Sequence, residues 1–160
     1  MRIAVISDTH QPRGRRRLPD ACLRELARAD LILHAGDFVA AEVLEELRAL
    51  APVTGVHGNQ DDVQLRMLLP ARRVVDVPGH RIGMVHDPGP QAGREARLAA
   101  LFPDCRLVVY GHTHVPEVTR HGAVTLLNPG SPTERRRGPY HAMATVTVGE
   151  RTLDTNICSL

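Results

Sequence analysis

Six short apolar segments of this chain each end in a polar cluster, and this repetition restricts the fold more than any other feature. The first segment, residues 2–6, is apolar at every position after Arg2, as expected of a central strand covered on both faces. It runs into Asp8 and His10. The other five run into Asp37, Asn59, His86, the pair His112 and His114, and Asn128. Because functional strand ends gather at one rim of an α/β sheet, these side chains are expected to meet there.

The segments between these strands carry helical patterns, which predicts the α/β class. Helices are expected at 20–29, 39–50, 62–69 and 91–102, and further strands at 31–35, 53–57, 72–77, 81–85, 107–109 and 124–127. Residues 141–148 alternate as a half-exposed strand, with which residues 151–157 can pair. His80 is expected at the exposed tip of a hairpin, without a role. The length of 160 residues suits a single domain over 1–160.

The pair His112 and His114 is the first candidate site. Side chains in extended backbone repeat every second residue, so both imidazoles are expected to face the same pocket. Such a pair is about as typical of loop histidines as of a metal site. For Asp8, the alternative to a ligand is a helix N-cap, which the intervening residues 11–14 disfavour. His34 is expected to bond to backbone or a neighbouring loop and not to bind metal.

Composition excludes several kinds of chemistry. All 20 basic residues are Arg, so no Walker-type or Schiff-base lysine exists. A net charge of +2, no Trp, two Tyr and two Phe argue against a polyanion partner and against a stacking platform for single-stranded bases. The three cysteines are too far apart for a disulfide framework or a Cys-based zinc site.

The cellular location of the protein and the surroundings of its candidate site can also be predicted. No apolar run approaches the roughly 20 residues of a membrane span, and a strand pattern follows Met1 at once, so we expect a cytoplasmic protein without a signal peptide. Arg13 and residues 15–17 form a basic loop beside Asp8 and His10. It is either a solvated charge run or an anion-steering lip, and Arg13 is the candidate for substrate binding.

Seven nitrogen and oxygen side chains from five strand ends are about what two adjacent divalent ions need. The set consists of Asp8, His10, Asp37, Asn59, His86, His112 and His114. Histidines combined with carboxylates suit Mn²⁺, Fe²⁺, Zn²⁺ or Ni²⁺, whereas Mg²⁺ and Ca²⁺ prefer oxygen ligands alone.

The order of these motifs resembles the calcineurin-like metallophosphoesterase superfamily. The matching motifs are Asp8-x-His10, Gly36-Asp37, Gly58-Asn59-x-Asp61, His86, Gly111-His112-x-His114 and Asn128-Pro129-Gly130-Ser131. The short length and the last motif are most similar to its small YfcE-type phosphodiesterases. The resemblance covers nearly the whole chain and implies a four-layer α-β-β-α sandwich, with two mixed sheets flanked by helices.

The resemblance also implies how two ions would be held. Asp8, His10, Asp37 and His114 would hold the first ion, and Asp37, Asn59, His86 and His112 the second, with Asp37 bridging. A hydroxide between the ions would attack phosphorus in a phosphodiester, and Asn59 would donate its amide to a phosphoryl oxygen. Mn²⁺ is the expected metal, with Fe, Zn or Ni as alternatives. The histidine pair is thus divided between two ions, although periodicity alone places both at one.

Two departures from the family pattern affect the substrate. Gln60 stands where phosphomonoesterase branches have a His that can protonate the leaving oxygen, and an amide cannot be a general acid. This favours phosphodiesters with good leaving groups, or a proton supplied by His57 or by the substrate. Residues 87–90 also differ from many relatives, which have Gly and a second His after the position of His86.

Two other functions remain open at this point. A retromer subunit that resembles this fold is a scaffold that has lost ligands, whereas all seven positions are kept here. A nuclease is the other alternative, which the Arg clusters allow and the scarcity of aromatics disfavours. The expected partner is a small phosphodiester; nucleic acid and membranes are not expected, and a homo-oligomer is left open.

Overall fold

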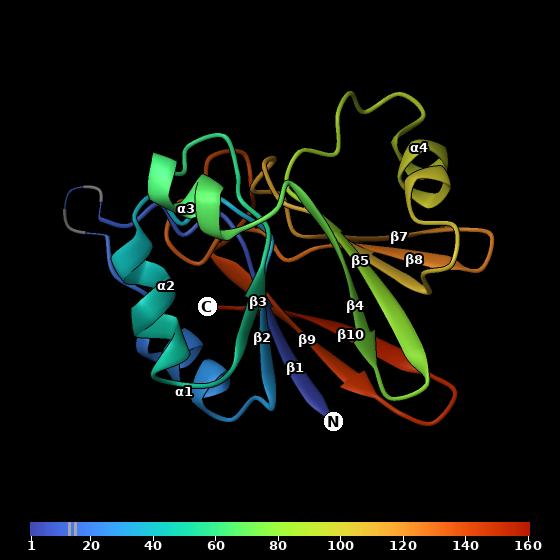
Figure 1. Cartoon of the computed structure of the whole chain (residues 1–160), viewed down its shortest axis with the longest axis horizontal. Coiled ribbons are helices and arrows are strands. Elements are labelled where there is room, and N and C mark those ends of the chain that lie inside the picture. Colours follow the sequence, from blue (N-terminus) through green and yellow to red (C-terminus); the bar gives the residue numbers. More distant parts are fainter. Residues whose placement is uncertain (13, 15) are drawn as a thin grey trace.

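The computed structural model describes residues 1–12, 14 and 16–160. In this part of the chain, ten strands form two five-stranded sheets that face each other (Figure 1). From edge to edge, the first sheet contains β10 (Leu153–Ser159), β9 (Ala142–Val148), β1 (Arg2–Ile6), β2 (Leu31–His34) and β3 (Val53–Gly55). The second contains β4 (Arg72–Val77), β5 (His80–Val85), β6 (Leu107–Val109), β8 (Val124–Asn128) and β7 (Glu117–His121).

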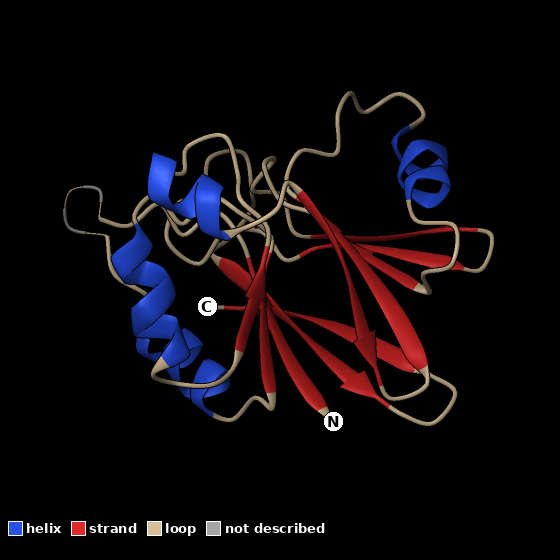
Figure 2. Cartoon of the chain, viewed as in Figure 1, coloured by secondary structure: helices blue, strands red, loops and turns tan. Residues whose placement is uncertain are grey.

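Helices cover the outer face of each sheet (Figure 2). Those beside the first sheet are α1 (Asp20–Ala27), α2 (Ala41–Arg48) and α3 (Val63–Leu68), and the one beside the second sheet is α4 (Arg94–Leu101). The expected four-layer α-β-β-α sandwich with two mixed sheets is therefore confirmed. Among the described residues, no helix is both long and apolar enough to cross a bilayer.

The consecutive apolar residues of the central strands are explained by these layers. In β1, Ile3 and Val5 belong to the core between the two sheets, while Ala4 and Ile6 pack with α1 residues such as Leu26. Alternate side chains of a strand point to opposite faces, so a strand covered on both sides is apolar throughout. The same holds in the second sheet, where β6 divides its side chains between the inter-sheet core and α4.

Parallel pairing brings the polar strand ends to the same rim. The strands β1, β2 and β3 are parallel, and so are β5, β6 and β8 in the second sheet. The carboxyl ends of parallel strands meet at one edge, which is where α/β folds bind ligands. Three contacts then join the loops beyond these ends: Asp8 N donates to Gly36 O, Gly111 N to His86 O, and His112 N to the Asp8 carboxylate.

Several local predictions need correction. β9 is not half-exposed: only Thr147 is exposed, because β9 lies inside the sheet between β1 and β10. His80 is not an exposed tip either, since it is 9% exposed and its Nε2 lies 3.0 Å from Gly149 O in the neighbouring turn. β7 was not anticipated from the sequence, because this edge strand is polar and largely open to solvent.

Two helices are shorter at their N-terminal ends than their apolar patterns predict. α2 begins at Ala41, and its N-cap Ala40 has extended backbone. α4 begins at Arg94 after Gly93, whose φ of 69° is left-handed. Glycine adopts this conformation readily and so starts the helix after the preceding loop.

The inter-sheet core provides a test of the sandwich. Leu33→Ala should lower the free energy of unfolding by about 2–5 kcal/mol, because a fully buried leucine would leave a cavity between the sheets. The matched change Leu23→Ala, at a position 37% exposed on α1, should cost about 1 kcal/mol or less. Urea unfolding of both variants measures the difference, and equal losses would contradict the packing described.

Candidate metal centre

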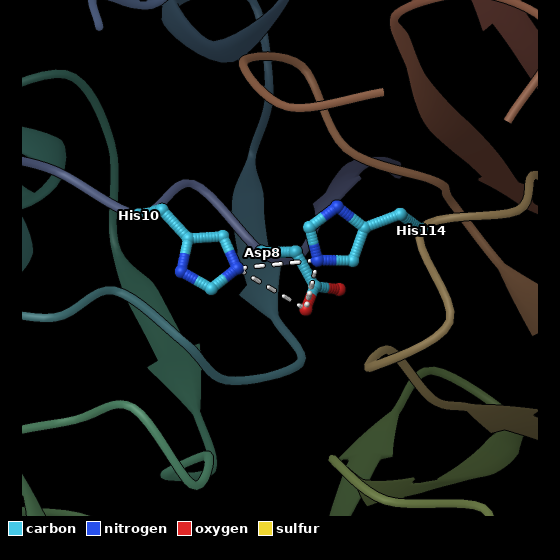
Figure 3. Close-up of side chains that lie close together, drawn as sticks. All are labelled: Asp8, His10 and His114. Atoms are coloured by element: carbon cyan, nitrogen blue, oxygen red, sulfur yellow. Dashed lines mark hydrogen bonds and ion pairs between the residues drawn. The ribbon is translucent and has the colours of Figure 1, made fainter. Parts of the chain in front are cut away.

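Three fully buried side chains form the inner half of the candidate site. Asp8 and His10 follow β1, and His114 follows β6. Their side chains point toward one another (Figure 3). The Nε2 atoms of His10 and His114 are 3.2 Å apart, and Asp8 Oδ1 lies 3.3 Å from His114 Nε2 and 3.8 Å from His10 Nε2. One carboxylate oxygen and two imidazole nitrogens therefore converge on a single point.

The outer half of the site lies around Asn59, which is exposed. Asn59 Oδ1 is 3.1 Å from His86 Nε2 and 3.1 Å from His112 Nδ1. Asp37 joins the two halves, because its Oδ2 lies 3.4 Å from His86 Nε2 and 3.7 Å from His10 Nε2. All seven predicted ligands are thus brought together in two adjoining groups. Their role as metal ligands stays a prediction.

The backbone at the site is left-handed at five of these seven positions. The φ angles are 56° at Asp8, 46° at His10, 60° at Asp37, 69° at His112 and 60° at His114. Non-glycine residues persist in this conformation only where surrounding structure holds them, and they cluster at functional sites.

These turns overturn one expectation. We predicted that His112 and His114 face one pocket because extended backbone alternates, but neither residue is extended. Instead, His114 lies against His10 and His112 lies against Asn59. The pair is divided between the two halves, as the resemblance implies.

Buried polar side chains hold the turns in place. Asn128 Nδ2 donates to Gly111 O (3.1 Å) and to Thr113 Oγ1 (2.9 Å), so this strand end supplies an anchor for the histidine loop. Gly111 is required there, because a Cβ atom would lie 2.0 Å from Ser7 Oγ. Ser131 Oγ donates to Asp8 O at 2.7 Å and ties the loop after β8 to the first strand.

Asp61 performs the same task for the loops after β2 and β3, although the sequence pattern did not assign it a role. Its carboxylate accepts hydrogen bonds from the backbone N–H groups of Gly58 (2.7 Å), Val39 (2.7 Å) and Asp37 (3.2 Å). Burial raises the pKa of Asp61, while the hydrogen bonds from Gly58 and Val39 work in the opposite direction. The side chains of Asp37 and Asn59 therefore start from fixed backbone.

Burial and charge act in opposite directions on the titratable groups. Burial lowers the pKa of His10 to about 4, so this imidazole is neutral near pH 7. Burial would lower the pKa of His86 too, but a hydrogen bond with Asp37 and the charge of Asp8 raise it to about 9. Burial would raise the pKa of Asp37, but the hydrogen bond and the charge of His86 lower it to about 2.

The chemistry of these donors fits a bound cation. Asp8 Oδ1 is buried and accepts no hydrogen bond, although it faces two imidazole nitrogens. In two of the histidines a backbone carbonyl orients the other ring nitrogen: Glu134 O contacts His114 Nδ1, and Ala35 O lies 2.8 Å from His86 Nδ1. In metal sites, such contacts fix which nitrogen is free to bind the ion. A cation at the outer half would displace the proton of His86, because metal ligands must be deprotonated.

Comparison with known proteins agrees with this geometry. Residues 1–151 match the family described as the calcineurin-like phosphoesterase superfamily domain. The chain belongs to this superfamily. It is 36% identical over 159 residues to a probable metallophosphoesterase of Methanothermobacter thermautotrophicus, covering 98% of this chain and 91% of that protein.

Two solved structures have the same fold over almost the whole length of this chain. A Thermotoga maritima protein determined by NMR in solution has a TM-score of 0.78 and 31% identity, with 99% of each chain covered. Wild-type Vps29 from Entamoeba histolytica, solved with Zn²⁺, has a TM-score of 0.79 and 23% identity, with 99% of each chain covered. At that identity, the second likeness shows the fold alone. The resemblance inferred from the motifs is confirmed.

Glu134 lies beside the candidate site although the sequence pattern gives it no role, since it is a single acid next to a run of arginines. Its Oε2 is buried without a hydrogen-bond partner, 3.7 Å from His10 Nε2. Its Oε1 lies 2.8 Å from Arg16 Nη2. The basic loop thus reaches the site through Arg16, while Arg13 and Arg15 lie outside the described residues, so substrate binding by Arg13 stays a prediction.

His34 lies beside the candidate metal centre and bonds to backbone and to a neighbouring loop, as expected. Its Nδ1 accepts from Gly36 N at 3.2 Å, and its Nε2 lies 3.1 Å from Thr9 Oγ1. The proton is therefore on Nε2, and the ring stacks on Phe38 with 3.4 Å between centroids. His57, the proposed proton donor, lines a pocket together with Asn59 and His86.

The neutral state of His34 predicts a pH dependence of stability. Burial lowers its pKa to about 3 in the folded protein, whereas an unfolded histidine has a pKa of about 6.5. Between these values the unfolded chain binds the extra proton, so the free energy of unfolding falls as the pH decreases. The loss from His34 should be about 2 kcal/mol between about pH 7 and about pH 5.

His34→Gln removes this titration and keeps an amide that can donate to Thr9. The variant should lose correspondingly less stability than the wild type over the same interval, measured by urea unfolding of metal-free protein at both pH values. If the two proteins lose equal stability on acidification, His34 is not neutral in the folded state.

Proposed function

We propose that this protein is a phosphodiesterase that uses two divalent transition-metal ions, with Mn²⁺ as the expected metal. The observation that carries the proposal is the convergence of Asp8 Oδ1 with the Nε2 atoms of His10 and His114, beside a second group around Asn59. When bound, the ions would lower the pKa of an attacking water and neutralise charge on the phosphoryl oxygens. Membership of a metallophosphoesterase superfamily supports a metal-dependent phosphoesterase in general.

The ligand residues would act from prearranged positions. Asp8, His10, Asp37 and His114 would hold the first ion, and Asp37, Asn59, His86 and His112 the second. The inner residues are buried, so their carboxylate and imidazole groups are shielded from water and have little freedom to rotate. The strained turns at five ligands mean that the site is formed before any substrate arrives.

Asn59 would also contact the substrate. Its Oδ1 lies between His86 and His112, and the residue is exposed at the mouth of the site. With Oδ1 so placed, the amide nitrogen is available to donate a hydrogen bond to a phosphoryl oxygen. This hydrogen bond would hold phosphorus over the ligand groups.

The leaving group explains the preference for diesters. Gln60 donates its backbone N–H to Asp37 Oδ1 (2.7 Å), and its amide side chain cannot act as an acid. His57 lines the pocket beside Asn59 and can supply a proton on that side. Substrates whose leaving oxygen needs little protonation would react fastest.

The second candidate is a binding protein of the same fold. The likeness of the fold to that of Vps29 is the observation that supports this alternative. The complete ligand set and the unpartnered Asp8 Oδ1 favour catalysis instead.

Removal of single histidines tests the two-ion centre. After loading with Mn²⁺, the wild type should hold two equivalents, and His112→Ala and His114→Ala should each lose about one, because they belong to different halves of the site. Hydrolysis of bis(4-nitrophenyl) phosphate should fall at least about 100-fold in both variants. Elemental analysis and a colorimetric assay provide the two measurements.

His121→Ala is the matched control, since His121 is exposed on β7, and it should match the wild type in both assays. A wild type that binds less than one equivalent of Mn²⁺ and hydrolyses no diester would favour the binding protein.

Substitution of Gln60 tests the missing general acid. Gln60→His should increase hydrolysis of glycerol 2-phosphate, an alkyl ester, at least about tenfold, since general acids contribute roughly 10²–10⁴-fold when well placed. Bis(4-nitrophenyl) phosphate should change little, because nitrophenolate leaves without a proton. Gln60→Asn is the control, and an equal increase in that variant would show that the side chain acts by some route other than proton donation.

A further inference from the structure

A second pocket opens beside His112, with a volume of about 620 Å³. It borders the candidate metal centre through His112, whereas the pocket of His57 borders it through Asn59 and His86. The two share no described lining residue, and the 3.1 Å contact between Asn59 Oδ1 and His112 Nδ1 lies between them. A volume of this size is typical of pockets that bind small molecules. One substituent of a phosphodiester held over Asn59 would point into it.

The second pocket is positively charged. Its lining includes Arg94, Arg136 and Arg137, and the one carboxylate among the described lining residues is Glu117. Glu117 is already engaged, because its Oε2 accepts from Tyr110 OH at 2.8 Å and lies 3.7 Å from Arg94 Nη1. A net positive charge therefore remains in the pocket.

Arg94 is held in place without full compensation of its charge. Its side chain is 14% exposed and its guanidinium lies 5.8 Å from the centre of the Tyr110 ring. Its buried Nε has no hydrogen-bond partner. The ion pair with Glu117, at 3.7 Å, is long for a charge-assisted hydrogen bond. The fold thus fixes a cation in the pocket wall, at the start of α4.

The other two arginines extend from the loop after β8. Arg136 Nη2 lies 3.5 Å from Glu134 Oε2, so this side chain is linked to the metal centre. Arg137 is exposed and makes no hydrogen bond or ion pair with any part of the chain that the structure describes. Its guanidinium is available to an incoming anion.

The lining also indicates what kind of group would bind. Apart from the His112 imidazole, no aromatic ring occurs among the described lining residues, so the pocket offers no ring platform for a nucleobase. Guanidinium groups instead match the geometry of phosphate oxygens and bind them with paired hydrogen bonds. A compact phosphorylated group fits these donors better than a base.

We propose that this pocket binds a second phosphate on the substituent that stays attached to phosphorus during hydrolysis; the inference rests on the proposed phosphodiesterase function. The leaving group would face the pocket of His57, which holds the candidate proton donor. The oxygen of a water molecule bonds to phosphorus, the P–O bond to the leaving group breaks, and the proton lost by the water passes to the solvent or to the leaving oxygen. The product is a phosphomonoester that carries a further phosphate.

Two synthetic esters with the same leaving group test the inference. Both are 4-nitrophenyl phosphodiesters, one with a 2-(phosphonooxy)ethyl substituent and one with a 2-methoxyethyl substituent, which has no hydroxyl to attack phosphorus. The Mn²⁺-loaded wild type should hydrolyse the phosphorylated ester with a kcat/KM at least about tenfold higher, chiefly through a lower KM. Arg137→Gln should reduce this ratio to about twofold or less.

Arg120→Gln is the matched control, because it removes the same charge from β7 at a position that lines a different pocket. It should keep the wild-type ratio and the wild-type rate with the methoxyethyl ester. Equal kcat/KM values for the two esters in the wild type, or an undiminished ratio in Arg137→Gln, would overturn the inference and leave the phosphodiesterase proposal intact.

A binding measurement keeps the pocket testable if neither ester is hydrolysed, an outcome that would contradict the proposed function. Calorimetric titration of 2-hydroxyethyl phosphate into metal-free protein should show a dissociation constant about tenfold weaker in Arg137→Gln than in the wild type or in Arg120→Gln. The absence of binding by the wild type, or equal binding by all three proteins, would show that the pocket does not recognise phosphate.

Discussion

The Asp8 carboxylate is the group on which the arrangement of the site depends. Its Oδ2 accepts hydrogen bonds from Ser7 Oγ (2.7 Å) and from His112 N (3.0 Å), which belongs to the loop of the opposite sheet. Its Oδ1 is left facing His10 and His114. One oxygen therefore joins the two sheets while the other is directed into the metal centre. Folding and ligand placement are coupled through a single side chain.

The coupling is reinforced by charge. Burial would raise the pKa of Asp8, but the close approach of His114 Nε2 and the nearby charge of His86 lower it. Protonated His86 thus balances Asp8 and Asp37 when no cation does. Attraction between protonated His86 and the two carboxylates thus helps to hold the residues of the candidate site together. This attraction lowers the cost of burying the carboxylates of Asp8 and Asp37.

Much of the fold could be predicted from the sequence, because the pattern of apolar residues along a strand indicates which of its faces are buried. Residues 3–6 and 107–109 are apolar at every position, which identified central strands covered on both faces. The edge strand β7 was not predicted, since a polar strand open to solvent has no such pattern. The shielding of His80 was not predicted either, because the covering turn lies 69 residues away along the chain.

The sequence predicted which residues belong to the candidate site, but it did not predict how they are arranged in space. Polar residues after successive strands pointed to one rim, whereas no pattern announced the left-handed turns that separate His112 from His114. Glu134 approaches His10 only through tertiary folding, and a lone acid among arginines gives no sign of this. Asp61 belonged to a recognised motif, yet its bonds to three backbone N–H groups emerge only in the structure.

The unequal burial of the two halves has a kinetic consequence. Asp8, His10 and His114 have no solvent exposure, and the segment from Ser131 to Glu134 lies across them, bonded to Asp8 O and to the His114 ring. Asn59, by contrast, is open to solvent. An ion in the inner position could leave only when that segment opens, so its residence time would follow local unfolding of the protein. An ion in the outer position would exchange with the surrounding solution, and the metal available there at any moment would determine which ion it holds.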